Sequence, residues 1–370
     1  MTLLNAILVT TDFSDEAHNA VRRAALIAAL HNARMTLLHV VDPTTLKGPR
    51  AWFSSQSGLD HKVAVAQAAL GRLAGEVAGR HDVHVSVEAL VGRPLELVCR
   101  KAEEADLLVI GSRRANSLRS LIFGTPTEQM LRLVRRPVLV TRQAAQTAYR
   151  RVLIAVDLDK SPHSMLRSAS VLAPAASLHV FHALSTRRMD RLQASDVPSA
   201  VIRDVGASER QQGLARLHAV LASTGLAGAQ ASVDHGEAPR LTLARQQELG
   251  ADLIVLGKDG SSALCNFLLG SVPQRVLSSA ACDVLVLPKV PLRGESGMAP
   301  LETWLDAGPR QTFEDLEVLQ NIGVAGIASK RPGPELAQTS DAVCALVDNR
   351  VGAAGGRVAH PTDREDLALQ

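Results

Sequence analysis

The chain has 370 residues with 40 basic and 37 acidic side chains, so its formal net charge is only +3. A length of this order predicts two or three domains. The basic residues are dispersed rather than gathered on one face, which makes nucleic acid an unlikely partner. No apolar run approaches the length of a membrane span, and no signal-peptide pattern opens the chain. We therefore expect a cytoplasmic protein that does not insert into membranes.

Aromatic residues are scarce: the chain has two Trp, one Tyr and six Phe. By contrast, 46% of its residues are hydrophobic. The core must therefore consist mainly of Ala, Leu and Val. The four cysteines show no CxxC spacing, which favours buried thiols in a reducing compartment over a disulfide framework or a metal site.

One pattern occurs twice along the chain, in the same order. The shared landmarks are the segments 6–12 and 152–157, the segments 106–111 and 252–257, the pairs Gly124-Thr125 and Gly270-Ser271, and the segments 136–140 and 282–286. A repeat of this length is a whole domain rather than a solenoid unit. We expect domains over 1–146 and 149–290, followed by a partly disordered tail over 291–370.

Apolar runs of strand length alternate with helical patterns in each copy. In the first copy, strands are predicted at 5–11, 35–41, 83–90, 106–111 and 137–141, and helices at 15–32, 60–79, 94–105 and 126–135. In the second copy, strands are predicted at 151–156, 177–183, 229–234, 252–257 and 283–287, with helices between them. Segments 42–59 and 184–197 are predicted to be long connections.

This alternation predicts the fold class. Near-continuous Val, Ile and Leu in the strands are typical of a parallel sheet covered on both faces. The fold class is therefore α/β, with two tandem doubly wound, five-stranded parallel-sheet domains. In the tail, 312–319 could form a short helix and 342–347 a short strand.

Aspartates follow the first strand of each copy. In a doubly wound sheet, ligands bind beyond the carboxyl ends of the strands where the winding reverses, and strands one and four should be neighbours there. Asp12 and Asp157 could accept hydrogen bonds from a base amino group or a ribose hydroxyl. Alternatively, each could cap the helix that follows.

Glycines follow the fourth strand at a regular spacing. In the second copy they are Gly257, Gly260 and Gly270, and Ser271 comes next. The first two permit a turn with a close backbone approach to a ligand, while Gly270-Ser271 opens a helix whose N–H groups can hold phosphate. Gly257 and its counterpart Gly111 could also be turn glycines without another role. The chain contains no Walker A and no GxGxxG sequence.

With this loop the sequence resembles the universal stress protein family, which uses G-x2-G-x9-G-(S/T) after strand four to bind ATP. The segments Leu37–Val41 and Pro137–Val140 are also similar to that family. The resemblance covers about residues 1–290 and implies a HUP-type fold. It implies an ATP site, with Mg²⁺, formed in the second copy by Asp157, Leu184, Gly257, Gly260, Gly270, Ser271 and Val272. The corresponding positions of the first copy are Asp12, Val41, Gly111, Gly124 and Thr125.

The two copies depart from the family pattern differently. Arg114 stands where the second glycine of the first copy belongs, and there it either crowds a ligand or pairs with a phosphate. Pro126 is tolerated at the first helical position. In the second copy Pro273 removes one N–H from the helix's first turn. We predict that the second copy is the competent site and that the first is degenerate or structural.

Three functions remain open. The resemblance favours a non-catalytic stress-response protein that binds an adenine nucleotide and responds by changing its protein partners or homo-oligomeric assembly. A nucleotide-free scaffold with two vestigial sites is the alternative, and a weak ATP hydrolase comes third, since Asp259 is the only carboxylate beside the loop. No metal site is expected, because His179 and His182 alternate across their strand; His39 and His182 are predicted to be partly buried with their hydrogen bonds satisfied.

Overall fold

The structure is a computed structural model that describes residues 4–45, 55–112, 126–195, 197–258 and 269–288. In the first repeat the elements are β1 (Ala6–Thr10), α1 (Asp15–His31), β2 (Arg34–Val41), the 3₁₀ turn η1 (Pro43–Thr45), α2 (Ser55–His81), β3 (Val85–Val91), α3 (Pro94–Ala102), β4 (Leu107–Gly111), α4 (Pro126–Leu133) and β5 (Val138–Thr141). In the second repeat they are β6 (Arg151–Val156), α5 (His163–Leu172), β7 (Ser177–Leu184), α6 (Arg187–Ala194), α7 (Ser199–Ser223), β8 (Gln230–His235), α8 (Ala238–Leu249), β9 (Leu253–Gly257), α9 (Ser271–Ser279) and β10 (Asp283–Leu287).

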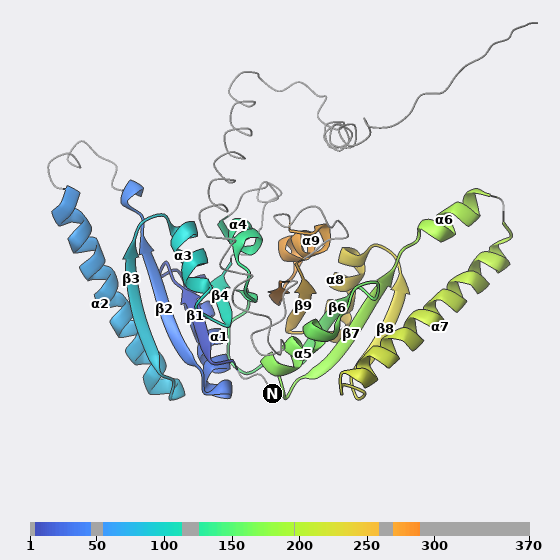
Figure 1. Ribbon diagram of the computed structural model, residues 1–370, viewed down its shortest axis with the longest axis horizontal. Helices are drawn as coiled ribbons and strands as arrows, with labels where there is room; N and C mark the ends of the chain where they lie inside the picture. The colour runs from blue at the N-terminus through green and yellow to red at the C-terminus, as the bar shows by residue number, and fades with distance from the viewer. Residues whose placement is uncertain (1–3, 46–54, 113–125, 196, 259–268, 289–370) are drawn as a thin grey trace, which may run out of the picture. The chain divides into compact units, whose positions relative to one another are not determined.

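The ten strands form one sheet in the order β3-β2-β1-β4-β5-β10-β9-β6-β7-β8 (Figure 1). Within each repeat all neighbouring strands are parallel, and the first and fourth strands are neighbours, as predicted. The repeats join through their fifth strands, where β5 pairs antiparallel with β10 and Leu139 lies opposite Leu285. The predicted α/β class with two tandem parallel-sheet domains is confirmed, and the two repeats pair with each other.

Local signals explain why α1 forms where it was predicted. The Ser14 hydroxyl accepts a hydrogen bond from the Ala17 amide at 3.3 Å, which satisfies one of the free N–H groups of the first turn. Asn32 ends the helix in the left-handed conformation with φ 51°, which asparagine adopts more readily than most residues. The apolar stripe between these caps is buried against the sheet.

Each face of the sheet is covered by helices, because neighbouring residues of a strand point to opposite sides. In β1, Ile7 and Val9 pack in one core with α1 and α2, whereas Leu8 packs in the other core with α3 and α4. The second repeat has α5 and α7 on the first face and α8 and α9 on the second. Helices on both faces make the strands apolar throughout, which is the pattern that the sequence displays.

The segment predicted as the connection 184–197 contains a helix, α6. None of its residues is buried, so it lacks the apolar stripe that indicates a helix in a sequence. The other predicted connection, 42–59, contains η1 and the start of α2. The tail over 291–370, with its predicted elements at 312–319 and 342–347, lies outside the described residues.

A buried carboxylate ties the two repeats together. The Asp283 side chain is completely buried, and its carboxylate accepts hydrogen bonds from Arg23 Nε at 3.1 Å and from the Tyr149 hydroxyl at 2.8 Å. It also accepts the backbone N–H groups of Arg142 at 2.7 Å and Gln143 at 3.1 Å. Arg23 stacks over the Tyr149 ring with 4.1 Å between guanidinium carbon and ring centroid. One side chain of the second repeat thus connects α1 and the linker that follows β5.

The two cysteines in the described part of the chain are free thiols. Burial raises the pKa of Cys99 and of Cys282 to about 12 in each case. The thiolate is the reactive form of cysteine, so both groups are inert structural thiols near neutral pH. This agrees with the buried thiols expected from the sequence.

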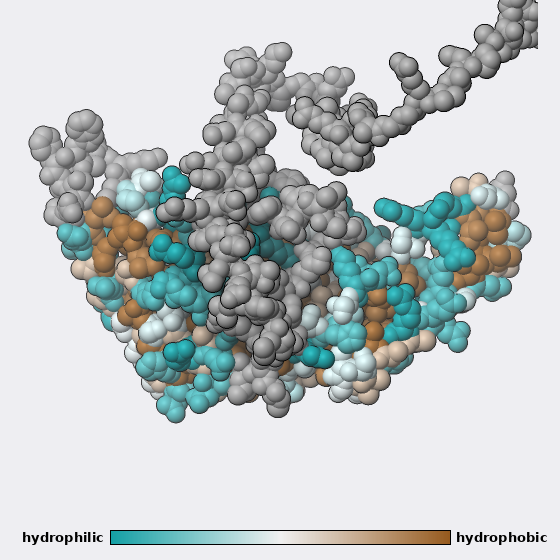
Figure 2. Space-filling model, in the orientation of Figure 1, coloured by the Kyte–Doolittle hydropathy of each residue, from teal (hydrophilic) through white to brown (hydrophobic). Residues whose placement is uncertain are grey.

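Hydrophilic residues cover much of the face shown in Figure 2, and a hydrophobic group lies at the first turns of α7, where Val201 is 46% exposed. Among the described residues, no helix combines the length and the apolar character that a bilayer crossing requires.

Candidate functional site

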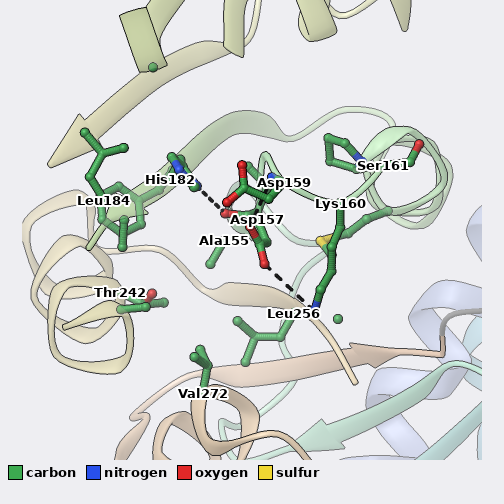
Figure 3. Close-up of a pocket in the computed structure, with 18 of the residues that line it drawn as sticks. Ala155, Asp157, Asp159, Lys160, Ser161, His182, Leu184, Thr242, Leu256 and Val272 are labelled. Atoms are coloured by element: carbon green, nitrogen blue, oxygen red, sulfur yellow. Dashed lines mark hydrogen bonds and ion pairs between the residues drawn. The ribbon is translucent and has the colours of Figure 1, made fainter. Parts of the chain in front are cut away.

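A cavity of about 1290 Å³ opens beyond the carboxyl ends of β6, β7 and β9 in the second repeat (Figure 3). β6 and β9 are neighbours in the sheet although they are far apart in the chain, so the winding reverses between them. This is the position where doubly wound sheets bind ligands. The loops after β6 and β7 and the helices α7, α8 and α9 complete the wall.

Most residues that the sequence predicted for the second-repeat site lie together around this cavity. They are Asp157, Leu184, Gly257, Ser271 and Val272. Gly270 is the buried N-cap residue of α9 and adjoins two of them. Gly260 and Asp259 lie outside the described residues. The structure therefore brings the ends of three strands and one helix start to a common opening.

The Asp157 carboxylate contacts a backbone N–H group of the loop after β6 and the ammonium group of Lys160. Its Oδ1 atom accepts the Asp159 N–H at 3.1 Å, and its Oδ2 atom lies 3.8 Å from Lys160 Nζ. The Asp157 side chain is 48% exposed. Its carboxylate therefore remains accessible to a hydroxyl or amino group in the cavity while it also stabilises the loop that follows β6.

The N-terminus of α9 faces the same opening. The N-cap residue Gly270 has no side chain, so no hydroxyl or carboxylate at the cap position itself covers the first N–H groups of the helix. Pro273 has no N–H, which leaves Ser271 and Val272 as the donors nearest to the start. Aligned peptide dipoles and exposed N–H groups favour an anion such as phosphate at this position.

Lys258 anchors the base of the loop that leads to α9, a role that sequence reasoning missed. Its N–H donates to the Leu287 carbonyl at 2.7 Å, and its own carbonyl accepts the Gly270 N–H at 3.1 Å. Its ammonium group donates to the carbonyls of Arg132, and of Val134 at 3.2 Å, at the end of α4. The first repeat therefore contacts the residue at which this loop begins, and a cation at a helix C-terminus is electrostatically favourable.

The cavity carries an excess of positive charge. Its lining includes seven Lys and Arg residues but only three Asp and Glu residues. Two of the acidic residues form ion pairs with arginines, since Arg188 lies 2.8 Å from Glu209 and Arg216 lies 3.4 Å from Asp159. Among the described lining residues cations therefore outnumber carboxylates, a balance that favours an anionic over a cationic ligand.

The histidines near the strand ends are satisfied by backbone, as predicted. His182 is 8% exposed, and its Nδ1 atom lies 3.0 Å from the Val156 carbonyl oxygen. His39 makes the corresponding contact with the Thr11 carbonyl at 2.7 Å. His179 lies on the other face of β7 and contacts Gln230 and Ser232 side chains. Within the described ranges, no three His, Cys, Asp or Glu side chains gather in a way that could hold a metal ion.

In the first repeat, the aspartate after the first strand participates in helix capping. Asp12 Oδ1 accepts hydrogen bonds from the Ser14 N–H at 3.0 Å and from the Ser14 hydroxyl at 2.5 Å. Val41 is buried at the end of β2 and accepts the Gly92 N–H at 3.1 Å. Arg114, Gly124 and Thr125 lie outside the described residues. Asp12 therefore orders the capping residue Ser14 rather than capping α1 itself, and its role towards a ligand stays a prediction.

The backbone at the start of α1 packs closely against Gly111 at the end of β4. A Cβ atom built on Gly111 would lie 2.5 Å from the Glu16 carbonyl oxygen, whereas one on Gly257 would meet, among the described residues, only Met165 Cε at 3.1 Å. The connection between strand and helix is shorter in the first repeat, over 11–14, than in the second, over 157–162. The start of α1 therefore occupies space that the second repeat leaves to its cavity.

We expect Gly111→Ala to lower the free energy of unfolding by about 1–3 kcal/mol, because backbone atoms must move to make room for the methyl group. Gly257→Ala serves as the matched control and should cost less, since the flexible end of Met165 can shift. Urea denaturation of both variants measures the difference. Equal destabilisation would show that α1 does not pack tightly against β4.

The Universal stress protein family matches the chain twice, over residues 4–142 and 148–288. A universal stress protein of Mycolicibacterium smegmatis is 28% identical over 302 residues, which cover 76% of this chain and 96% of the relative. A universal stress protein of Mycobacterium tuberculosis is 26% identical over 300 residues, with the same two coverages of 76% and 96%.

Among solved structures, the crystal structure of a universal stress protein from Archaeoglobus fulgidus superposes with a TM-score of 0.59 at 19% identity and covers 77% of this chain and 99% of its own. At that identity the likeness concerns the fold alone. The two family matches coincide with the two repeats that the sheet topology shows. The chain belongs to the universal stress protein family and carries two tandem domains of that family.

Proposed function

We propose that this protein binds an adenine nucleotide, ATP in the first instance, in the cavity of its second repeat. The observation that carries the proposal is the convergence of Asp157, Leu184, Gly257, Ser271 and Val272 on one positively charged cavity. These residues come from three strand ends and one helix start, and the resemblance to the family had implied all of them. We propose domain boundaries of 1–146 and 149–290, with 291–370 as a separate tail.

Each wall of the cavity suits a different part of the nucleotide. The start of α9, at Ser271 and Val272, would hold phosphate oxygens through its N–H groups. Asp157 would accept a ribose hydroxyl. The end of β7, at Leu184, would lie against the base.

We further propose that the protein acts as a binding protein rather than an enzyme. The described carboxylates at the cavity, Asp157, Asp159 and Glu209, already pair with Lys160, Arg216 and Arg188 respectively. Carboxylates engaged in this way suit the positioning of a ligand better than proton transfer. Bound nucleotide would change the surface that 257–271 presents and thereby the assembly or the protein partners.

The first repeat would serve as a built-in partner subunit. Its β5 completes the sheet, its α4 receives Lys258, and its Arg23 pairs with Asp283. Meanwhile the start of α1 fills the space beside Gly111. A single nucleotide per chain is therefore expected.

Calorimetric titration with MgATP tests this proposal. Wild-type protein should bind one equivalent, and Gly270→Val should weaken binding by about a hundredfold, because a branched side chain at the start of α9 obstructs the phosphate. Gly124→Val alters the matching position of the first repeat and should leave affinity unchanged. No binding by the wild type would overturn the proposal in favour of a nucleotide-free scaffold, and equal loss in both variants would refute its assignment to the second repeat.

A further inference from the structure

At two strand positions of the cavity wall, the side chain in the second repeat is smaller than the matching side chain in the first repeat. Ala155 pairs with Phe181 in the sheet as Thr10 pairs with Leu38 in the first repeat, so Ala155 occupies the position of Thr10. By the same register Ala183 occupies the position of Val40. Both alanines line the cavity. The second repeat therefore leaves open a space that a threonine and a valine occupy in the first.

A third matched position carries a change of polarity rather than of size. Gly92 and Gly236 donate their N–H groups to the ends of β2 and β7 respectively. These glycines therefore correspond to each other in the two repeats, and so do the helices that follow them, α3 and α8. At the same distance beyond these glycines, the first repeat has Val98 and the second has Thr242. Valine and threonine have almost the same shape, so the substitution adds one hydroxyl to an otherwise apolar position.

The hydroxyl of Thr242 lacks a hydrogen-bond partner in the part of the chain that the structure describes. The residue is 0% exposed and belongs to the cavity wall, at the side of the Figure 3 view where Leu184 also lies. A buried hydroxyl without a partner destabilises a fold, and native proteins rarely keep one without a reason. A ligand with a hydrogen-bonding atom at this position would provide that reason.

The surroundings of Thr242 define the chemistry of such a ligand group. On the face of the sheet that α8 covers, the apolar side chains that line the cavity are Ala155, Phe181, Ala183, Leu256 and Val272. Transfer of a phosphate into such surroundings is very unfavourable, because it would lose its hydration without gaining charged partners. A heteroaromatic ring has apolar faces for these side chains and polar atoms along its edge for one hydroxyl.

We propose that Thr242 is a specificity-determining residue that hydrogen-bonds to the polar edge of the nucleotide's base, which enters the space beside Ala155 and Ala183. The inference rests on the proposed nucleotide function and extends it to a further residue. The glycine spacing did not point to Thr242, and the first repeat has a valine at the matched position. Because a hydroxyl can donate and accept, Thr242 recognises a hydrogen-bonding edge and excludes a purely apolar ring.

Thr242→Val tests the inference, since valine is the residue that the first repeat carries at this position. We expect the variant to keep or raise the melting temperature of the ligand-free protein, because it removes an unpaired buried hydroxyl. We expect its Kd for ATP to rise about five- to tenfold, the usual effect of one lost hydrogen bond. Thr242→Ser retains the hydroxyl and should bind ATP with a Kd close to that of the wild type.

Inorganic tripolyphosphate provides a probe that has no base. Its Kd should be the same for wild type and Thr242→Val. The inference is overturned if Thr242→Val binds ATP as tightly as the wild type, or if it weakens ATP and tripolyphosphate by the same factor. Failure of the proposed function is recognised separately, since in that case the wild-type protein itself does not bind ATP.

Discussion

Asp283→Ala is expected to lower the free energy of unfolding by about 3–5 kcal/mol, because it leaves a buried guanidinium without its counter-ion. Arg23 lies 3.1 Å from the carboxylate and is itself only 4% exposed. The variant also deprives the Tyr149 hydroxyl and the N–H groups of Arg142 and Gln143 of their acceptor. Guanidinium chloride denaturation, followed by circular dichroism, measures the change.

The matched control for this prediction is Asp159→Ala. Asp159 also faces an arginine, but its side chain is 84% exposed, and exposed pairs contribute little to stability. The free energy of unfolding of the Asp159→Ala variant should remain within about 1 kcal/mol of that of the wild type. If Asp283→Ala unfolded at the same denaturant concentration as Asp159→Ala, the buried network could not be what holds the repeats together.

Ala155→Thr combined with Ala183→Val is expected to raise the Kd for ATP about ten- to a hundredfold. The double variant rebuilds in the second repeat the wall that Thr10 and Val40 form in the first. Overpacking of this kind costs about 1–3 kcal/mol where the space is needed, and each 1.4 kcal/mol changes an affinity tenfold. Calorimetric titration gives the affinity, and the melting temperature of the ligand-free variant shows whether the fold is retained.

Val40→Ala in the first repeat is the corresponding control. It should leave the affinity for ATP unchanged, because the start of α1 still lies against Gly111 and that repeat gains no room for phosphate. An unchanged Kd in the double variant would instead mean that the ligand does not reach the space beside Ala155 and Ala183.

The two repeats differ systematically at matched positions. The first repeat keeps larger side chains at the strand ends and brings α1 close to β4, and both features favour packing. The second repeat has smaller side chains, a longer connection after β6 and, on α8, a hydroxyl for which the described residues offer no hydrogen-bond partner. Each feature of the second repeat costs stability, and a bound ligand would restore it.

The sequence by itself determined much of this protein. Apolar strands alternating with helical patterns predicted two parallel-sheet domains, because such strands are stable only when helices cover both faces. Ser14 and the acidic residues after it placed the start of α1. The spacing of Gly257, Gly270 and Ser271 indicated that the end of one strand and the start of the next helix lie together, and the structure places Gly257 and Ser271 at one cavity.

Only the tertiary structure decided how the repeats meet and why they differ. Asp283 contacts Arg23 across a separation of 260 positions, and Lys258 reaches the carbonyls that end α4. The closure at Gly111 likewise depends on where the backbone of α1 packs. Thr242 resembles any helical threonine until its burial and missing partner are known. Local sequence patterns encode helices, strands and turns, whereas these features depend on which distant side chains the packed sheet brings into contact.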